Sequence, residues 1–467
     1  MIPLPDPITD ISLVRELCMA VAVGLGFLAI LGTAEVWRRR SAPPTEWTRK
    51  FVHVTSGLLA MTFPWLFASH LTLLVLGSTL ITLFTVARRQ GWLRAVLDVE
   101  RDSAGERWFP VGVYLLFLVG HRQPVFYLVA LCALVISDTL AALLGRRYGM
   151  SQFAAGKGRK SLEGSAAFLL ATFLGVHIPL LILTDIGRFE TVMIAMQLAL
   201  IATCLELIAE RGSDNVIIPL AVYYLLVKMT PYGWQWIGWQ LLAQLTLLSV
   251  VLVIARWNRF LSFAGAIAAH LVLYATFSLG SPTWTPAALL TLIGYLSVTA
   301  VRRERAKLPA GGYQVNGVFH MAVVAIVLLL LENSLATLPQ TGAPWRGDHP
   351  LFGPFIATLA APLAMTVARV QHPERQRPPG WRWVIGAVVA VIGVAGPGLL
   401  AGGSQRLSTD LALCILLIAV AVVVCAFLDR RGRLTAKPLP ELTAQSVSSA
   451  VAALIVTPPY LRFIGVL

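Results

Sequence analysis

The run "PVFYLVALCALVISDTLAALL" (residues 124–144) carries a single charged side chain, Asp138, in an otherwise apolar stretch. About 20 apolar residues are enough for a helix to cross roughly 30 Å of hydrocarbon. Because backbone groups cannot stay unpaired in lipid, a run of this kind forms a helix rather than an isolated strand. The stretch therefore predicts a membrane-spanning helix with one acidic side chain inside it.

Apolar runs of this kind recur along the whole chain. Of its 467 residues, 57% are hydrophobic and 13% are charged, and the mean hydropathy is +0.75. A soluble protein of this length needs far more polar surface, and the sequence lacks the ten-residue alternation of an outer-membrane barrel. We therefore expect an all-α, polytopic transmembrane helical bundle of about 16 spans, within a range of about 14 to 16. The expected spans are residues 13–37, 51–68, 70–87, 109–120, 124–144, 165–184, 191–209, 215–232, 236–255, 261–280, 285–301, 314–332, 351–369, 383–402, 407–428 and 445–465.

The basic loops predict the orientation of the chain. A formal net charge of +14 could indicate a nucleic-acid partner, but the cations gather in short loops between apolar runs, as the positive-inside rule describes. No nucleic-acid partner is therefore expected. If the N-terminus lies outside, every basic loop falls on the cytoplasmic side. These loops are residues 38–50, 88–107, 146–160, 256–259, 302–307, 371–382 and 429–437.

Polar groups that are unusual in a membrane concentrate in the first half of the chain, residues 1–232, whereas residues 233–467 contain fewer of them. Two domains with a boundary near "TPYGWQW" (230–236) are therefore expected. The N-terminal sequence matches neither a signal peptide nor an arginine-rich transit peptide. We accordingly expect an integral protein of a bacterial inner (plasma) membrane.

Two polar clusters precede residue 150. In "RKFVHVTSG" (49–57), Arg49 and Lys50 begin a predicted helix and His53 lies about one turn inside it. Taken alone, cations that snorkel to the interface are the simpler interpretation. In "ISDTLAALLGRRYG" (136–149), Asp138 lies at a depth where a carboxylate is costly, with Arg146 near the exit of the helix. Such a carboxylate marks an ion or substrate path, or pairs with an arginine of a neighbouring helix.

Two further clusters follow. "GKGRKSLEGS" (156–165) places cations directly before a predicted helix, whose N-terminal N–H groups and dipole favour an anion. Its spacing is not that of a Walker loop, and an ordinary basic loop is the alternative. In "CLELIAERGSDNVIIP" (204–219), Glu206 lies inside a helix, and Asp214 with Asn215 could either cap the next helix or complete a site.

Together the four clusters supply what phosphoryl transfer needs. The carboxylates Asp138, Glu206 and Asp214 offer oxygen ligands for Mg²⁺, and Lys160 with Arg49 or Arg146 could hold phosphate oxygens. All four clusters are predicted to face the cytoplasm, where nucleotides are found. The surrounding helices would give access to an acceptor that stays in the lipid bilayer.

In this order and spacing, "RKFVHVTSG", "SDTLAALLGRRYG", "KSLEGS" and "E…DNVIIP" resemble the phytol kinase and dolichol kinase family of integral membrane lipid kinases. The resemblance covers roughly residues 35–230. It implies transfer of the γ-phosphate of CTP, or of another nucleoside triphosphate, to the hydroxyl of phytol, geranylgeraniol or a polyprenol, with Mg²⁺ as cofactor. The alternatives are a CTP-dependent diacylglycerol kinase, a phosphatidate cytidylyltransferase-like enzyme or, from another class, a transporter.

The resemblance also implies roles for single residues. Catalysis is expected at Asp138, Lys160 and Asp214, and the metal is expected at Asp138, Glu206 and Asp214. The residues expected to bind the nucleotide are Arg49, Lys50, His53, Thr139, Arg146, Lys157, Ser161, Glu163, Gly164 and Asn215.

The second half more faintly resembles the phytyl-phosphate kinase-like membrane family, through "LSFAGAIAAHLV" (261–272) and "YQVNGVFHMAVV" (313–324). Where that family has an acidic motif, this chain has "LAAPLAMTVARV" (359–370), which contains no carboxylate. We therefore expect the second half to be a scaffold or a degenerate copy of the first. A structural hydrogen bond is the favoured explanation for Asn316 and His320.

Overall fold

The computed structural model describes residues 6–97, 104–155, 158–258, 261–305, 315–337 and 351–368, together with single residues and short pieces between 385 and 458. Nearly all of these residues are helical, which confirms the all-α class. The chain divides into two compact units, Met1–Leu242 and Ala243–Leu467. The sequence placed the boundary between its two halves at residue 232, and the function of each half stays a prediction.

Nine helices in the described ranges are long and apolar enough to cross a membrane. The count of about 16 spans remains a prediction, and most of the segments expected at 383–402 and 407–428, with part of that at 445–465, lies outside the described residues. The nine helical segments are Leu13–Ser41, His70–Gln90, Pro124–Tyr148, Leu162–Leu183, Arg188–Ile208, Trp234–Trp257, Phe263–Gly280, Pro282–Val301 and Val315–Ser334.

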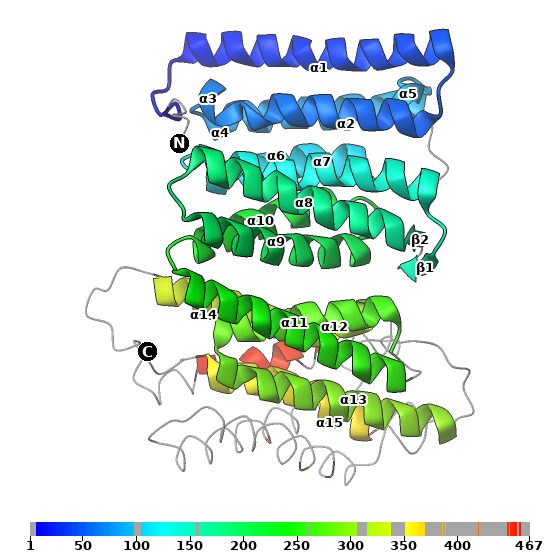
Figure 1. The fold of residues 1–467 in the computed structure, drawn as a ribbon, viewed down its shortest axis with the longest axis vertical. Helices are drawn as coiled ribbons and strands as arrows, with labels where there is room; N and C mark the ends of the chain where they lie inside the picture. Colours follow the sequence, from blue (N-terminus) through cyan, green and yellow to red (C-terminus); the bar gives the residue numbers. More distant parts are fainter. Residues whose placement is uncertain are drawn as a thin grey trace. The chain divides into compact units, whose positions relative to one another are not determined.

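Unit 1 is a bundle of long helices that lie side by side (Figure 1). The helix α7 is central to it, because α2, α6, α8 and α10 all pack against it. Its middle is buried on all sides, which explains why residues 124–144 read as one continuous apolar run. The helices of this unit are α1 (Leu13–Ser41), α2 (Thr45–Met61), α3 (Phe63–Leu66), α4 (His70–Gln90), α5 (Arg94–Leu97), α6 (Gly105–Gly120), α7 (Pro124–Tyr148), α8 (Leu162–Leu183), α9 (Arg188–Ile208), α10 (Asp214–Met229) and the first part of α11 (Trp234–Trp257).

A two-stranded hairpin interrupts the helical pattern between α7 and α8. Strands β1 (Gln152–Ala155) and β2 (Gly158–Ser161) pair antiparallel, and Phe153 lies opposite Lys160 in the register. The sequence predicted only a loop here. Ser161 ends the second strand and begins α8, because its hydroxyl oxygen accepts a hydrogen bond from the Gly164 N–H at 3.1 Å. The hairpin therefore holds Lys160 at the start of a helix.

Glycines bring the helices around α7 close together. Gly145 of α7 and Gly164 of α8 face each other so tightly that a Cβ on either would contact the other helix or Ser161. On α6, a Cβ at Gly112 would overlap the backbone carbonyl of Asn215 at the start of α10. This approach fixes the first turn of α10 against α6.

Gly112→Ala should therefore lower the stability of the protein by about 1–3 kcal/mol, because α6 and α10 must separate to admit the methyl group. The unfolding midpoint of the detergent-solubilised protein would measure it. Gly32→Ala is the matched control, since Gly32 is also inside a helix but a Cβ added to it would have no neighbouring atom within 4 Å. An unchanged midpoint for Gly112→Ala would contradict this packing.

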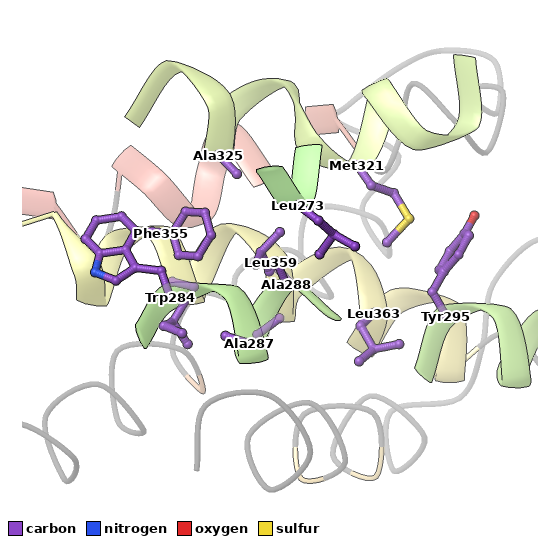
Figure 2. Packing of buried hydrophobic residues seen from close by; sticks show 14 of the residues in the cluster. Leu273, Trp284, Ala287, Ala288, Tyr295, Met321, Ala325, Phe355, Leu359 and Leu363 are labelled. Carbon is purple, nitrogen blue, oxygen red and sulfur yellow. The ribbon is translucent and has the colours of Figure 1, made fainter. Parts of the chain in front are cut away.

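Unit 2 contains the rest of α11 and a separate hydrophobic core. Figure 2 shows part of this core, in which Trp284 lies beside Phe355 with ring centroids 4.9 Å apart. His320 forms a hydrogen bond with Ser446 at 2.7 Å, which agrees with a structural role for this histidine. The elements are α12 (Phe263–Ala275), the π-helix η1 (Thr276–Gly280), the 3₁₀ helix η2 (Pro282–Trp284), α13 (Thr285–Arg305), α14 (Val315–Thr337) and α15 (Phe352–Ala368).

Candidate active site

The four polar clusters meet at one end of unit 1, which we call the hairpin end. It contains β1 and β2, the C-terminal ends of α7 and α9, and the N-terminal ends of α2, α6, α8 and α10. A cavity of about 1110 Å³ lies here and extends between the helices. The predicted site residues that line it are Arg49, Lys50, His53, Asp138, Arg146, Lys160, Ser161, Gly164, Glu206, Asp214 and Asn215.

Two side chains of α2 lie against Asp138, and one of them, Lys50, holds it. The ammonium group of Lys50 donates to Asp138 Oδ2 at 2.5 Å and to the Asp138 backbone carbonyl at 3.0 Å. His53 Nε2 lies 3.5 Å from the same carboxylate oxygen, without the alignment of a hydrogen bond. The Lys50 side chain is only 3% exposed, so this buried ion pair fixes the position of the carboxylate. The expected partner on a neighbouring helix is thus a lysine rather than an arginine.

Lys160 reaches across the cavity from β2 to the end of α9. Its Nζ donates to Glu206 Oε1 at 2.7 Å and also to the Glu206 backbone carbonyl. Both side chains remain partly exposed to the cavity. An ammonium group in this place can exchange a protein acceptor for phosphate oxygens without being drawn out of a buried site.

Glu46 connects two of the predicted cations, and the sequence did not single it out. Its carboxylate accepts from Arg49 Nη2 at 2.5 Å and from Arg146 Nη2 at 3.2 Å, and it is itself buried. Arg49 and Arg146 therefore stand together at the rim of the cavity although they come from α2 and α7. The one available signal was the spacing of Glu46 and Arg49, three residues apart at the start of a helix.

Several buried oxygens of residues that line the cavity have no hydrogen-bond partner. They are Glu206 Oε2, Asp214 Oδ1 and Asn215 Oδ1. Asp214 does not cap α10, because the residue at the cap is Ser213 and no side chain makes the capping hydrogen bond. Burial, followed by the negative charge of Asp138, raises the pKa of the Asp214 carboxyl above its ordinary value. A cation bound beside Asp214 would reduce that electrostatic cost.

The carboxylate oxygens available in the cavity suit one magnesium ion held by two protein carboxylates, instead of the three that the sequence predicted. Within the described residues, no three His, Cys, Asp or Glu side chains lie close enough to hold a single ion, so Asp138, Glu206 and Asp214 do not form one cluster. The Asp138 carboxylate is already paired with the ammonium group of Lys50. The unpartnered oxygens of Glu206 and Asp214 remain, and Mg²⁺ in nucleotide sites usually takes one or two carboxylates plus phosphate oxygens.

Two predicted residues are placed differently, and the position of a third is not described. The Thr139 hydroxyl donates to the carbonyl of Val135 in its own helix at 2.8 Å and does not line the cavity. Glu163 accepts from the Ser151 N–H at 3.1 Å, so it anchors the start of the hairpin. Lys157 lies outside the described residues.

Comparison with known proteins points to the same family of lipid kinases as the sequence motifs. Neither a family model nor a solved structure matches the chain. The phytol kinase of Synechocystis sp. is 30% identical to it over 207 residues, which cover 43% of this chain and 88% of that protein. More than half of this chain therefore lies outside the match. Since the matched region spans nearly the whole of that relative, the chain belongs to the phytol kinase family.

Proposed function

We propose that this protein is a lipid-alcohol kinase, which transfers the γ-phosphate of CTP or another nucleoside triphosphate to the hydroxyl of a membrane isoprenoid alcohol. Phytol, geranylgeraniol and longer polyprenols are the acceptors we consider. The observation that carries the proposal is a single cavity lined by cations and carboxylates, in which Glu206 and Asp214 each keep one buried oxygen without a hydrogen-bond partner. The named activity of the relative, phytol kinase, supports the same reaction.

The triphosphate would bind at the hairpin end. Lys160 offers an ammonium group there, and Arg49 and Arg146 offer two guanidinium groups at the rim. The N-terminus of α8, behind Ser161, adds the positive end of a helix dipole, which favours an anion. CTP as the preferred nucleotide follows from the family resemblance.

Glu206 and Asp214 would hold Mg²⁺ together with the phosphates. The bound ion would neutralise charge that develops on the phosphate oxygens during transfer. Asn215, whose side-chain oxygen is also unpartnered, stands beside Asp214 at the start of α10.

In the transfer step, the alcohol oxygen forms a bond to the γ-phosphorus, and the bond from that phosphorus to the bridging oxygen breaks. The nucleoside diphosphate leaves with the electron pair of the broken bond, and the alcohol proton passes to a carboxylate. We assign this base to Asp138, because it lines the cavity and its carboxylate lies 3.5 Å from His53 Nε2, whose ring contacts Phe109. Lys50 is then a positioning residue, since it holds Asp138 rather than substrate.

The active site is proposed to face the cytoplasm of a bacterial inner membrane. The hairpin end contains Arg38, Arg39 and Arg40 at the end of α1, and Arg88 and Arg89 at the end of α4. Arg146 and Arg147 end α7 on the same side. Such an excess of cations favours the inner side of the membrane.

Purified protein in detergent with Mg²⁺ should move label from γ-labelled CTP, but not from α-labelled CTP, into an isoprenoid alcohol. The label would be counted in the organic phase after separate incubations with phytol, geranylgeraniol, a polyprenol and diacylglycerol. Chelation of the metal with EDTA should stop transfer and added Mg²⁺ should restore it.

The alternatives give different results in the same assay. Label from α-labelled CTP in the lipid would indicate a cytidylyltransferase, and γ-label on diacylglycerol would indicate a diacylglycerol kinase. No transfer with any nucleotide would contradict the kinase and favour transport. Against transport, the unusual polar groups crowd one end of unit 1 instead of the middle of its helices.

A further inference from the structure

The cavity is larger than its polar part. Beyond Lys50, His53 and Asp138 it continues between α1, α2, α4 and α6, where its lining changes to apolar side chains. We call this part the apolar arm. Phe27 and Leu31 of α1 line it on one side, and Leu73, Leu80 and Phe84 of α4 line it on another. These side chains point inward, because Phe27, Leu31, Leu73 and Phe84 are all buried although they lie in otherwise lipid-exposed helices.

We propose that the apolar arm holds the hydrocarbon chain of the acceptor alcohol and limits the length of chain that the enzyme accepts. This inference rests on the proposed kinase function. The arm and the polar part form one cavity, so a chain in the arm would present its hydroxyl end to Asp138. At about 1110 Å³, the whole cavity is as large as the biggest of the roughly 300–1,000 Å³ typical of ligand pockets, which leaves room for both a nucleotide and a lipid chain.

The length of the arm agrees with a lipid chain from one leaflet. Leu73 and Phe84 mark its two ends on α4, and their separation of eleven positions corresponds to about 17 Å of helix. Half of the hydrocarbon core is about 15 Å thick. The arm therefore runs far enough to hold the chain of an alcohol that enters from one leaflet.

Gly77 is the position at which the arm can be narrowed. It lies on α4 between Leu73 and Phe84 and lines the cavity. The nearest atoms to a Cβ at this position belong to Pro110 of α6, at 3.9 Å, so a side chain can begin there without a clash. Gly77 is seven residues from Phe84, or about 10 Å along the helix. Pro110 is the neighbour of Phe109, whose ring contacts His53 beside Asp138, so a large side chain at Gly77 would narrow the arm close to the polar site and obstruct longer chains more than shorter ones.

The test compares Gly77→Phe with wild type on isoprenoid alcohols of two, three and four isoprene units. We expect kcat/KM to fall about tenfold or more for the four-unit alcohol, relative to the two-unit alcohol. Gly32→Phe is the matched control, because Gly32 is an exposed helix glycine of α1 that does not line the cavity. It should not change the preference for chain length. Gly77→Leu, a smaller obstruction, replaces Gly77→Phe if that variant does not fold.

The outcomes separate this inference from the proposed function. If wild type phosphorylates none of the alcohols, the proposed function fails. If wild type is active and Gly77→Phe keeps the wild-type preference for length, the arm does not hold the acceptor chain. An equal loss for all three alcohols would also overturn the inference, because a bilayer lipid bound permanently in the arm would give that result.

Discussion

Asp138→Asn should lower kcat by about 10²–10⁴-fold, the range that a general base contributes. Asparagine has nearly the same shape and can still accept a hydrogen bond from Lys50, but it cannot take up the alcohol proton. The measurement is the rate of γ-phosphate transfer at saturating nucleotide and alcohol. Binding of the nucleotide and of the hydrocarbon chain should change less than turnover, because the proposed contacts to these groups come from other side chains.

The control for this variant is Asp185→Asn. Asp185 is exposed and lies between α8 and α9, at the end of unit 1 away from the hairpin. Its substitution by asparagine removes the same negative charge. It should keep wild-type turnover. Both proteins must be checked for the same yield in the membrane and the same elution from gel filtration. A folded Asp138→Asn enzyme with near-normal turnover would show that the base lies elsewhere.

Asp138 was predictable because a carboxylate in an apolar helix is costly and needs a reason. The next residue, Thr139, shows where the same argument ends. A helix turns about 100° per residue, so neighbours in a motif face different directions. The Thr139 hydroxyl donates a hydrogen bond to a backbone carbonyl of its own helix, and the residue does not line the cavity. A motif indicates a region, whereas the orientation of each side chain depends on the packed helix.

Other features gave no usable signal in the sequence. The strands of the hairpin are only four residues each, too short to show an alternating pattern next to glycine and lysine. The sequence also gives no signal for which residues line the apolar arm. Leu73 and Leu74 are adjacent leucines in one apolar run, yet Leu73 is 3% exposed and lines the cavity while Leu74 is 42% exposed. Lipid and protein interior are both apolar, so composition cannot separate them.

Lys160→Ala should lower kcat/KM for the nucleotide by about 10²–10³-fold, as expected when one donor to a developing phosphate charge is lost. Lys160→Arg keeps the charge and should recover part of this loss. The matched control is Arg188→Ala, which removes an exposed cation from the start of α9, at the far end from the hairpin. Nucleotide KM and kcat are to be measured separately, with the alcohol saturating.

A purely structural role for Lys160 makes a different prediction. Its ammonium group donates to Glu206 Oε1 at 2.7 Å, so Lys160→Ala also leaves that carboxylate without its cation. If neutralising Glu206 were the whole function of Lys160, the double variant Lys160→Ala/Glu206→Gln would regain activity, because the uncompensated charge would be gone. If Lys160 holds the triphosphate and Glu206 holds the metal, the double variant should be at least as inactive as either single one. Recovery in the double variant would therefore contradict both assignments, whereas continued loss with an increased nucleotide KM would separate phosphate binding from simple charge balance.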